Sequence, residues 1–499
     1  MSLYYLTYFL LLTPYIPIFL AFKTSKTSDK SKFKIIGYMI LLILIIYFYL
    51  NGMIDSLSLI YGLCSLYVAL FVSLYSIHYV RNNNYPSYTD LFIDLFALSM
   101  IIAFLSPNIL GLVIAWTTAE IIGFLLISIG EKHSIEGSTR SSETFLFLSA
   151  LTFELSVFTT IYISIFITAS MIVSFAGEFS LKPLIEPFWV LSLNRVSIPG
   201  YMVFLLVLGF ITKSALVPLH FWLPSAHTVA PSPASALLSG VMTAMGVYGL
   251  LRINMFVNLN FPPLIYILIT LSIISVIYGG IQAIIQRDGK KLLAYSTIAG
   301  NGFAISILAY YLYTGDVDVL ATLIISVMAH MGYKTTLFLD MGIIEEITGF
   351  RYLHKLRGLV NITPISVLGG MLAFLSLVGF PPTAGFTSKL FSVLVLITRI
   401  HDPVSMGVLL SVICYIVLSI MIGLHYVKAY FGEASFVFKT SKINATQQYY
   451  VLFTGLSNIL FTLALLAFTS FQGYVLIYSM AAPVLLIFLY LVNNIMRRG

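Results

Sequence analysis

The most informative feature of the sequence is how little charge it carries. Only 9% of its 499 residues are Asp, Glu, Lys or Arg, while 59% are hydrophobic and the mean hydropathy is +1.00. Ordinary soluble domains carry about 25% charged residues, so this chain lacks the polar surface that a water-facing exterior requires. The composition excludes a soluble enzyme and predicts an all-α polytopic protein of the lipid bilayer.

Cysteine is also scarce, which bears on metal and redox chemistry. Cys64 and Cys414 both lie in hydrophobic stretches and stand far apart, so we expect buried small hydrophobic residues, with no metal or iron-sulfur site on this chain. The net charge of +7 does not indicate nucleic acid, because the basic residues lie in short loops between apolar runs. The first apolar run, 3–22, holds two prolines and lacks a basic start, so we expect a membrane span and no cleaved signal peptide.

Apolar runs of spanning length predict fourteen or fifteen transmembrane helices, because about 20 apolar residues cross a bilayer. The runs are 3–22, 35–50, 57–80, 91–107, 108–129, 144–169, 201–219, 234–257, 263–285, 290–312, 318–345, 362–398 (interrupted), 404–430, 449–470 and 473–493. An N-terminus on the outer side places most lysines and arginines in inside loops, including the five within 23–34, as the positive-inside rule requires.

Two of these runs are interrupted in a way that lipid does not tolerate unless protein or water satisfies the freed backbone groups. The first interruption, 209–233, contains four prolines, and the second is 379–389. The basic residues in them are Lys213, His220, His227 and Lys389. Paired interruptions indicate an internal repeat with an ion or substrate site at the membrane midplane.

Ionisable residues within the spans need a partner or a function, because a charge at the bilayer centre costs about 2.5–3.5 kcal/mol. We expect Glu120 and Lys213 to form an ion pair that opens and closes, so that the lysine takes up and releases a proton. The alternative is a static pair that fixes helix packing. Lysine suits proton exchange because its protonation state responds readily to burial.

The remaining candidates lie near the interruptions and along one later span. His330 and Lys334 are four residues apart, which places both on one helix face. His220, His227 and His330 are candidates for a proton relay, although the first two could instead anchor the interrupted segment. Asp340 lies six residues beyond Lys334, off that face, and we expect it to be structural or interfacial.

The run from Lys213 to Gly240, KSALVPLHFWLPSAHTVAPSPASALLSG, closely resembles the signature of the antiporter-like subunits of respiratory complex I. The same family includes large subunits of Mrp-type cation/proton antiporters and membrane subunits of energy-converting hydrogenases. Further matches in order are LYSIHY at 74–79, KKLLAYSTI at 290–298, HMGYKTTLFL at 330–339, TGFR at 348–351 and GFPPTAGFTSK at 379–389.

The resemblance implies about 14 transmembrane helices with two inverted five-helix repeats, each containing a broken helix. The boundaries it suggests are 1–90 for N-terminal helices, 91–257 for the first repeat, 263–430 for the second and 431–499 for C-terminal helices. It further implies that Glu120 and Lys213 form the working pair, that His330 and Lys334 form the central relay, and that Lys389 exchanges protons at the end of the second half-channel.

For function, the resemblance implies a proton-translocating, itself non-catalytic subunit of a complex I-like or hydrogenase-like oxidoreductase in the plasma membrane. Other membrane subunits and peripheral redox subunits would be its partners, and quinone and iron-sulfur clusters would reside in them. The alternatives are a subunit of an Mrp-type Na⁺/H⁺ antiporter or ion-driven anion importer, or a subunit retained for assembly. The last arises because many relatives have lysine or histidine where this chain has Thr243 and Ala244.

Overall fold

The computed structural model consists of helices and loops throughout the residues that it describes. These residues are 9–133, 140–160, 197–397, 399–400, 402–432 and 445–468. Nine helices among them are long and apolar enough to cross a membrane, and four shorter apolar helices accompany them. The all-α polytopic prediction is confirmed, while the count of fourteen stays a prediction, and the predicted span 473–493 lies outside the described residues.

Long helices alternate with short helical segments along the chain. In order they are α2 (Tyr15–Lys23), α3 (Thr27–Leu50), α4 (Ser56–Asn82), α5 (Tyr88–Leu105), α6 (Ile109–His133), α7 (Ser141–Phe145), the π-helix η1 (Leu146–Ala150), α11 (Gly200–Lys213), α12 (Trp222–Val229), α13 (Ser232–Leu237), the π-helix η2 (Leu238–Met242), α14 (Thr243–Phe256), α15 (Pro262–Ile285), α16 (Gly289–Thr314), α17 (Val317–Thr348), the 3₁₀ helices η3 (Leu353–Lys355) and η4 (Leu359–Asn361), α18 (Pro364–Val378), α19 (Ala384–Ile397), α20 (Pro403–Val427) and α21 (Ala445–Phe468).

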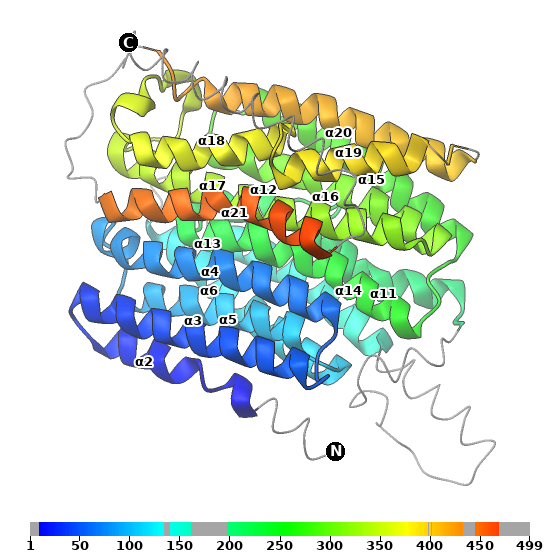
Figure 1. Cartoon of the computed structure of the whole chain (residues 1–499), viewed down its shortest axis with the longest axis horizontal. Coiled ribbons are helices and arrows are strands. Elements are labelled where there is room, and N and C mark those ends of the chain that lie inside the picture. Colours follow the sequence, from blue (N-terminus) through cyan, green and yellow to red (C-terminus); the bar gives the residue numbers. More distant parts are fainter. Residues whose placement is uncertain are drawn as a thin grey trace. The chain divides into compact units, whose positions relative to one another are not determined.

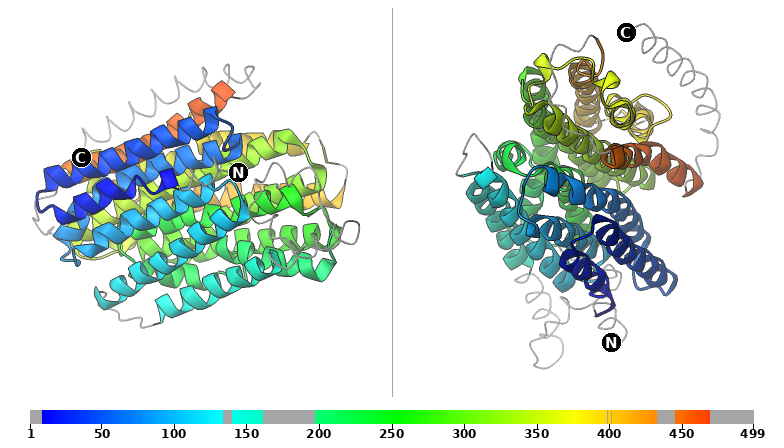
Figure 2. Two further views of the ribbon diagram at one scale, coloured as in Figure 1. Left: turned by 90° about the horizontal axis from the view of Figure 1, so that it is seen from below. Right: turned by 90° about the vertical axis from the view of Figure 1, so that its left-hand side faces the viewer.

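The chain divides into two compact units. Unit 1 comprises 1–234 and 241–267, and unit 2 comprises 235–240 and 268–499. In unit 1, α3 packs against α4, α4 against α5, and α5 against α6 (Figure 1). In unit 2, α17 packs against α16, α18, α19 and α21, and Figure 2 shows the helices within each unit running along a common direction. The predicted repeat boundaries stay a prediction.

Helix starts in the loops are set by carboxylate caps. The side chain of Asp55 accepts a hydrogen bond from the Ser58 amide at the start of α4, and Asp402 forms a capping box with Ser405 at the start of α20. Such caps satisfy amide groups that have no partner within the helix. The side chains between these ends are apolar on nearly all faces, as expected where lipid or other helices surround a helix.

Both predicted interruptions are confirmed. The helix α11 ends at Lys213, residues 214–221 form a non-helical link, and α12 begins at Trp222. The helix α18 ends before Gly379, whose φ is +86°, and α19 begins at Ala384. Pro218 in the first link and Pro381 and Pro382 in the second lack an N–H and cannot continue the helical ladder, which explains why the breaks fall there.

Two details of the sequence-based prediction are wrong. The predicted span 201–219 ends at Lys213, six residues early, because the link that contains Pro218 begins there. The span predicted from residue 35 begins at Thr27, so Lys34 is not a loop residue but lies buried within α3. Cys64 is buried as expected, whereas Cys414 on α20 is partly exposed.

Candidate functional site

The centre of unit 1 contains an ion pair between Glu120 of α6 and Lys213, the last residue of α11. The two side chains are 2% and 0% exposed, so the charges are removed from solvent. The Trp116 indole also donates to Glu120 Oε1 at 3.2 Å. A buried carboxylate and a buried ammonium this close compensate for each other's loss of hydration. Each group therefore needs the other in order to stay charged.

Ser149 connects the two charges. Its hydroxyl accepts a hydrogen bond from Lys213 Nζ at 2.5 Å and lies 3.2 and 3.1 Å from the two oxygens of Glu120, to which it can donate. Ser149 belongs to the π-helix η1, where the helical register shifts. A hydroxyl that accepts from a cation and donates to an anion can pass a proton between them.

The helix break positions Lys213. The Trp222 indole at the start of α12 donates to the Thr212 carbonyl at 3.0 Å and so ties α12 to the end of α11. Lys213 Nζ lies 5.2 Å from the centroid of the Phe145 ring and 5.5 Å from that of Trp222. Carbonyls at a helix end and aromatic faces both stabilise a cation, so the ammonium is held here by more than Glu120.

The structure places His220 and His227 in the same broken segment, but not in the contact shell of Lys213. His220 lies in the link and His227 on α12, and both are buried. The His220 ring lies 4.3 Å from that of Phe221. Among the described residues, the polar contacts of Lys213 are made with Glu120 and Ser149. A role for the two histidines in proton transfer stays a prediction.

In unit 2, Lys334 of α17 points toward α16. Its ammonium donates to the Leu293 carbonyl at 2.9 Å and to the Ser296 hydroxyl. Lys334 is fully buried, and within the described part of the chain no carboxylate lies within ion-pair distance of it. This lysine is therefore solvated by neutral oxygens, unlike Lys213.

A pair of tyrosines joins His330 to the second helix break. The Tyr333 hydroxyl lies 3.1 Å from His330 Nδ1 and 2.9 Å from the Tyr415 hydroxyl of α20. Lys389 Nζ lies 5.1 Å from the centroid of the Tyr415 ring. His330, Tyr333, Tyr415 and Lys389 thus form a buried row within unit 2, in which hydrogen bonds link the first three and Lys389 lies against the Tyr415 ring.

The second break supplies the oxygen ligands of Lys389. Its ammonium donates to the carbonyls of Leu377 and Val378 at 2.6 and 2.9 Å and to the Ser419 hydroxyl at 2.6 Å. The two carbonyls belong to the last turn of α18, where they lack helical partners. A Cβ on Gly379 would lie 2.6 Å from Lys389 Cδ, so glycine here permits both the left-handed backbone and the approach of the lysine.

Asp340 lies outside this row, and a structural or interfacial role for it stays a prediction. Its carboxylate accepts hydrogen bonds from Ser366 at 2.6 Å, Tyr430 at 2.7 Å and Tyr426 at 3.1 Å, and its side chain is buried. The sequence reasoning missed Ser149, Tyr333 and Tyr415. The only signal available for Tyr333 was its position three residues after His330 on the same helix.

For metal binding, the described residues offer no group of three His, Cys, Asp or Glu side chains close enough to hold an ion. Thr243 and Ala244, where the resemblance leads us to expect a basic residue, are both buried in α14.

A chain with this many apolar helices, and with lysines buried at two helix breaks, is a multi-pass integral membrane protein. The family model described as "NADH:quinone oxidoreductase/Mrp antiporter, TM" matches residues 106–419, well over half of the sequence. The chain therefore belongs to this family, which confirms the resemblance.

Curated relatives are similar over part of their length. A Na(+)/H(+) antiporter subunit of Alkalihalophilus pseudofirmus is 29% identical over 73% of this chain and 45% of its own length. A Na(+)/H(+) antiporter subunit of Staphylococcus haemolyticus is 30% identical over 67% of this chain and 41% of its own. The chain thus spans less than half the length of these two relatives.

Two solved structures share the fold. A chain of the Mrp complex from Dietzia sp. DQ12-45-1b superposes with a TM-score of 0.71 at 15% identity, covering 93% of this chain and 94% of that one. A chain of the membrane-bound sulfane sulfur reductase, an archaeal respiratory membrane complex, gives 0.70 at 21% identity, covering 91% and 75%. At these identities the likeness concerns the fold alone.

Proposed function

We propose that this chain is a proton-translocating, itself non-catalytic subunit of a multisubunit complex of the plasma membrane. The observation that carries the proposal is the Glu120–Lys213 pair at the break between α11 and α12, sealed from solvent and bridged by Ser149. A buried pair that served only packing would need no hydroxyl able to shuttle a proton between its two members.

In unit 1 the working step is the separation of Glu120 from Lys213. Moving the carboxylate away leaves the ammonium buried without a counter-ion, which costs several kcal/mol. Release of the proton removes that cost, and return of the carboxylate favours uptake of the next proton. Ser149 gives the proton a path during the exchange.

In unit 2 the proposed path follows His330, Tyr333, Tyr415 and Lys389. The tyrosine hydroxyls can each accept and donate one proton, so a proton arriving at His330 has a hydrogen-bonded route as far as Tyr415. Lys389 at the second break is the proposed exchange group at the end of this path. Lys334 is assigned to the same relay, and passage between the two units stays a prediction.

The partners and the driving reaction are inferred from the relatives. The curated relatives are named as Na⁺/H⁺ antiporter subunits, which favours an Mrp-type antiporter, with several other membrane subunits as partners. The fold shared with a respiratory reductase supports the second candidate, a redox-driven complex whose quinone and iron-sulfur clusters would reside in peripheral subunits. Purification from the native membrane with identification of partners, iron and acid-labile sulfide separates the two.

The site itself is tested with Lys213→Met and Glu120→Gln in the intact complex. We expect both variants to assemble and to lose proton movement into membrane vesicles, by at least about 100-fold, the low end of what one positioned proton-transfer group contributes. The matched control is Lys290→Met, which removes another buried lysine, paired with Glu345 at 3.1 Å. Normal proton movement in Lys213→Met would overturn the proposal, as would an equal loss in the control.

A further inference from the structure

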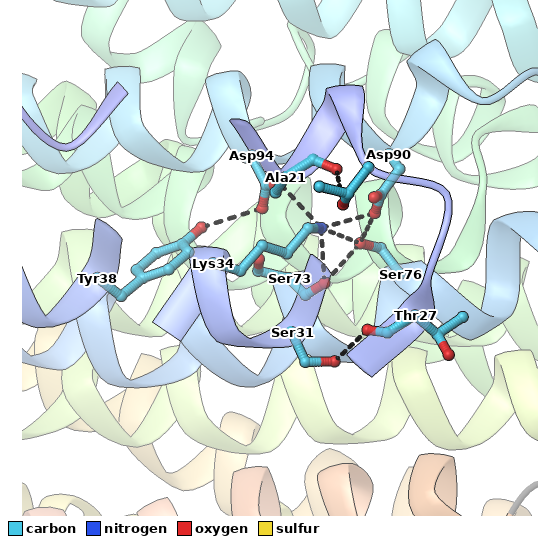
Figure 3. A network of polar contacts seen from close by, with 10 residues as sticks. Ala21, Thr27, Ser31, Lys34, Tyr38, Ser73, Ser76, Asp90 and Asp94 are labelled. Atoms are coloured by element: carbon cyan, nitrogen blue, oxygen red, sulfur yellow. Dashed lines mark hydrogen bonds and ion pairs between the residues drawn. The ribbon is translucent and has the colours of Figure 1, made fainter. Parts of the chain in front are cut away.

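Unit 1 contains a second buried cluster, which neither proposed proton path uses. Lys34 of α3 lies between Asp90 and Asp94 of α5, with Nζ 2.7 Å from Asp90 Oδ1 and 2.8 Å from Asp94 Oδ2 (Figure 3). The side chains of Lys34, Asp90 and Asp94 are 1%, 7% and 1% exposed. Nζ also donates to the Ser73 carbonyl at 2.9 Å and lies 3.2 Å from the Ser76 hydroxyl.

The charges in this cluster do not balance. One ammonium faces two carboxylates, which leaves a net charge of −1 in a site sealed from solvent. Two carboxylates sharing one buried site do not both stay ionised when a single positive charge is available, because the second negative charge is uncompensated. One more unit of positive charge is required.

The hydrogen-bond pattern indicates which oxygen carries it. Asp90 Oδ1 accepts from both Lys34 and Ser76, the latter at 2.5 Å, as an ionised carboxylate does. Asp94 is different: its Oδ1 lies 3.5 Å from the Tyr38 hydroxyl, a long contact. The buried Ser73 hydroxyl lies near Asp94 and Tyr38 and satisfies the geometry of no hydrogen bond among the described residues.

A proton on Asp94 Oδ1 supplies the missing positive charge. The protonated oxygen becomes a donor from which the nearby Ser73 hydroxyl can accept after a rotation of the serine side chain, while Oδ2 still accepts from Lys34. We infer that Lys34, Asp90 and Asp94 form a binding site for one exchangeable proton, held on Asp94. This site goes beyond the proposed function, since it binds a proton whether or not the chain transports one.

The position of the cluster allows exchange with one water phase. Lys34 is seven residues from the start of α3, about 10 Å at 1.5 Å per residue. Asp90 is the third residue of α5, and Ser76 lies six residues before the end of α4. All three helices thus bring the cluster within about two turns of the same membrane face, which the basic residues of 23–32 predict to be the inside.

The surrounding helices carry other titratable groups. They are Tyr38, Lys30 and the Asp29–Lys32 ion pair on α3, His78 and Arg81 on α4, and Tyr15 and the exposed Lys23 on α2. Tyr38 and His78 are the ones that interact electrostatically with the two carboxylates. Neither alters the count of one ammonium against two carboxylates as long as His78 is neutral.

The test counts protonated carboxyl groups by infrared spectroscopy of the purified full chain at neutral pH. Wild type should show the C=O stretch of one protonated carboxyl from this cluster, identified as the band lost in Asp94→Asn. Asp90→Asn should lose it too, because Asp94 then becomes the ionised partner of Lys34. Lys34→Met should instead gain a second band, since both carboxylates then need a proton. Asp340→Asn, which removes another buried carboxyl, should leave the cluster's band unchanged.

The test remains decisive even if one of the variants fails to fold. An asparagine at 94 has nearly the shape of the protonated aspartate and keeps a donor for Ser73, so Asp94→Asn should match wild type in thermal stability. If Lys34→Met fails to fold, the double variant Lys34→Met/Asp94→Asn should restore folding with a single band. The inference is overturned if wild type and Asp94→Asn have identical spectra, or if the band appears in wild type only when Na⁺ is withdrawn, which would make this a sodium site. None of these outcomes depends on proton transport.

Discussion

Replacing Tyr333 by phenylalanine removes one oxygen atom and breaks the row of groups in unit 2 at two points. The hydroxyl lies 3.1 Å from His330 Nδ1 and 2.9 Å from the Tyr415 hydroxyl, and phenylalanine retains neither contact. A positioned proton-transfer group contributes typically about 10²–10⁴-fold to the rate of a proton-transfer step. We therefore expect proton flux to fall at least about 100-fold in Tyr333→Phe.

Tyr333→Phe should also destabilise the fold, and this loss of stability must be distinguished from the loss of proton flux. The Tyr415 hydroxyl is buried and would be left without its partner, which destabilises by about 1–3 kcal/mol. Tyr426→Phe is the matched control: it also removes a buried hydroxyl, the one that donates to Asp340 at 3.1 Å, and Asp340 keeps other donors. We expect the control to lose similar stability and to keep its proton flux.

The assay is proton uptake into vesicles that contain the intact complex, followed with a pH-sensitive dye and normalised to the amount of assembled complex. Tyr333→Phe/Tyr415→Phe should be no slower than Tyr333→Phe alone, because one break already interrupts a linear path. Wild-type flux in Tyr333→Phe would refute the path, and so would an equal loss of flux in Tyr426→Phe.

Two further substitutions test the helix ends. Gly379→Ala should reduce proton flux several-fold, because the new Cβ would lie 2.6 Å from Lys389 Cδ and push the lysine off its carbonyl ligands. Gly349→Ala is the control, because Gly349 has a similar φ of +74° and its added Cβ would meet nothing within 4 Å. It should incur the same backbone strain of about 1–2 kcal/mol and keep its proton flux. Asp55→Asn should lower stability in detergent by about 3 kcal/mol at pH 7, because it leaves the buried Arg252 without its counter-ion. Burial raises the pKa of the Asp55 carboxyl, but the hydrogen bonds and charge of Arg252 outweigh this and hold the pKa below its ordinary value of 3.8. The stabilisation is therefore present above pH 3.8 and is lost as the pH falls further, so thermal unfolding of wild type and Asp55→Asn should converge at low pH, and a constant difference would contradict the pair.

The parts of this fold that the sequence predicts are those fixed by local chemistry. Apolar runs of bilayer length define the helices, and prolines without an N–H define the breaks after Lys213 and at Gly379. The pairing of Glu120 with Lys213 was also predictable, because each is a single charge deep in an apolar run and needs the other.

The parts that it does not predict depend on packing between distant helices. Lys34 lies in a basic stretch, so the sequence predicts that it belongs to an inside loop. The structure shows instead that α3 begins at Thr27 and includes Lys34. The spacing of Asp90 and Asp94, four residues apart on one helix face, was the available signal for a buried cation between them. Ser149 reaches its partners from a π-helix, and Leu146–Ala150 has no sequence feature that predicts such a register shift.

The buried lysines differ in what neutralises them, and this difference constrains how each can exchange a proton. When Lys213 loses its proton, the Glu120 carboxylate stays behind as a buried, uncompensated charge, so proton release there requires Glu120 to move away or to be protonated in turn. Lys389 is held by two carbonyls and a hydroxyl, which carry no net charge, so its neutral form leaves no buried ion behind. Exchange at Lys389 therefore needs only a proton path, whereas exchange at Lys213 needs a coupled movement of charge. Under the proposed function, Glu120, rather than any residue around Lys389, is therefore the place where a neighbouring subunit could control the protonation of this chain.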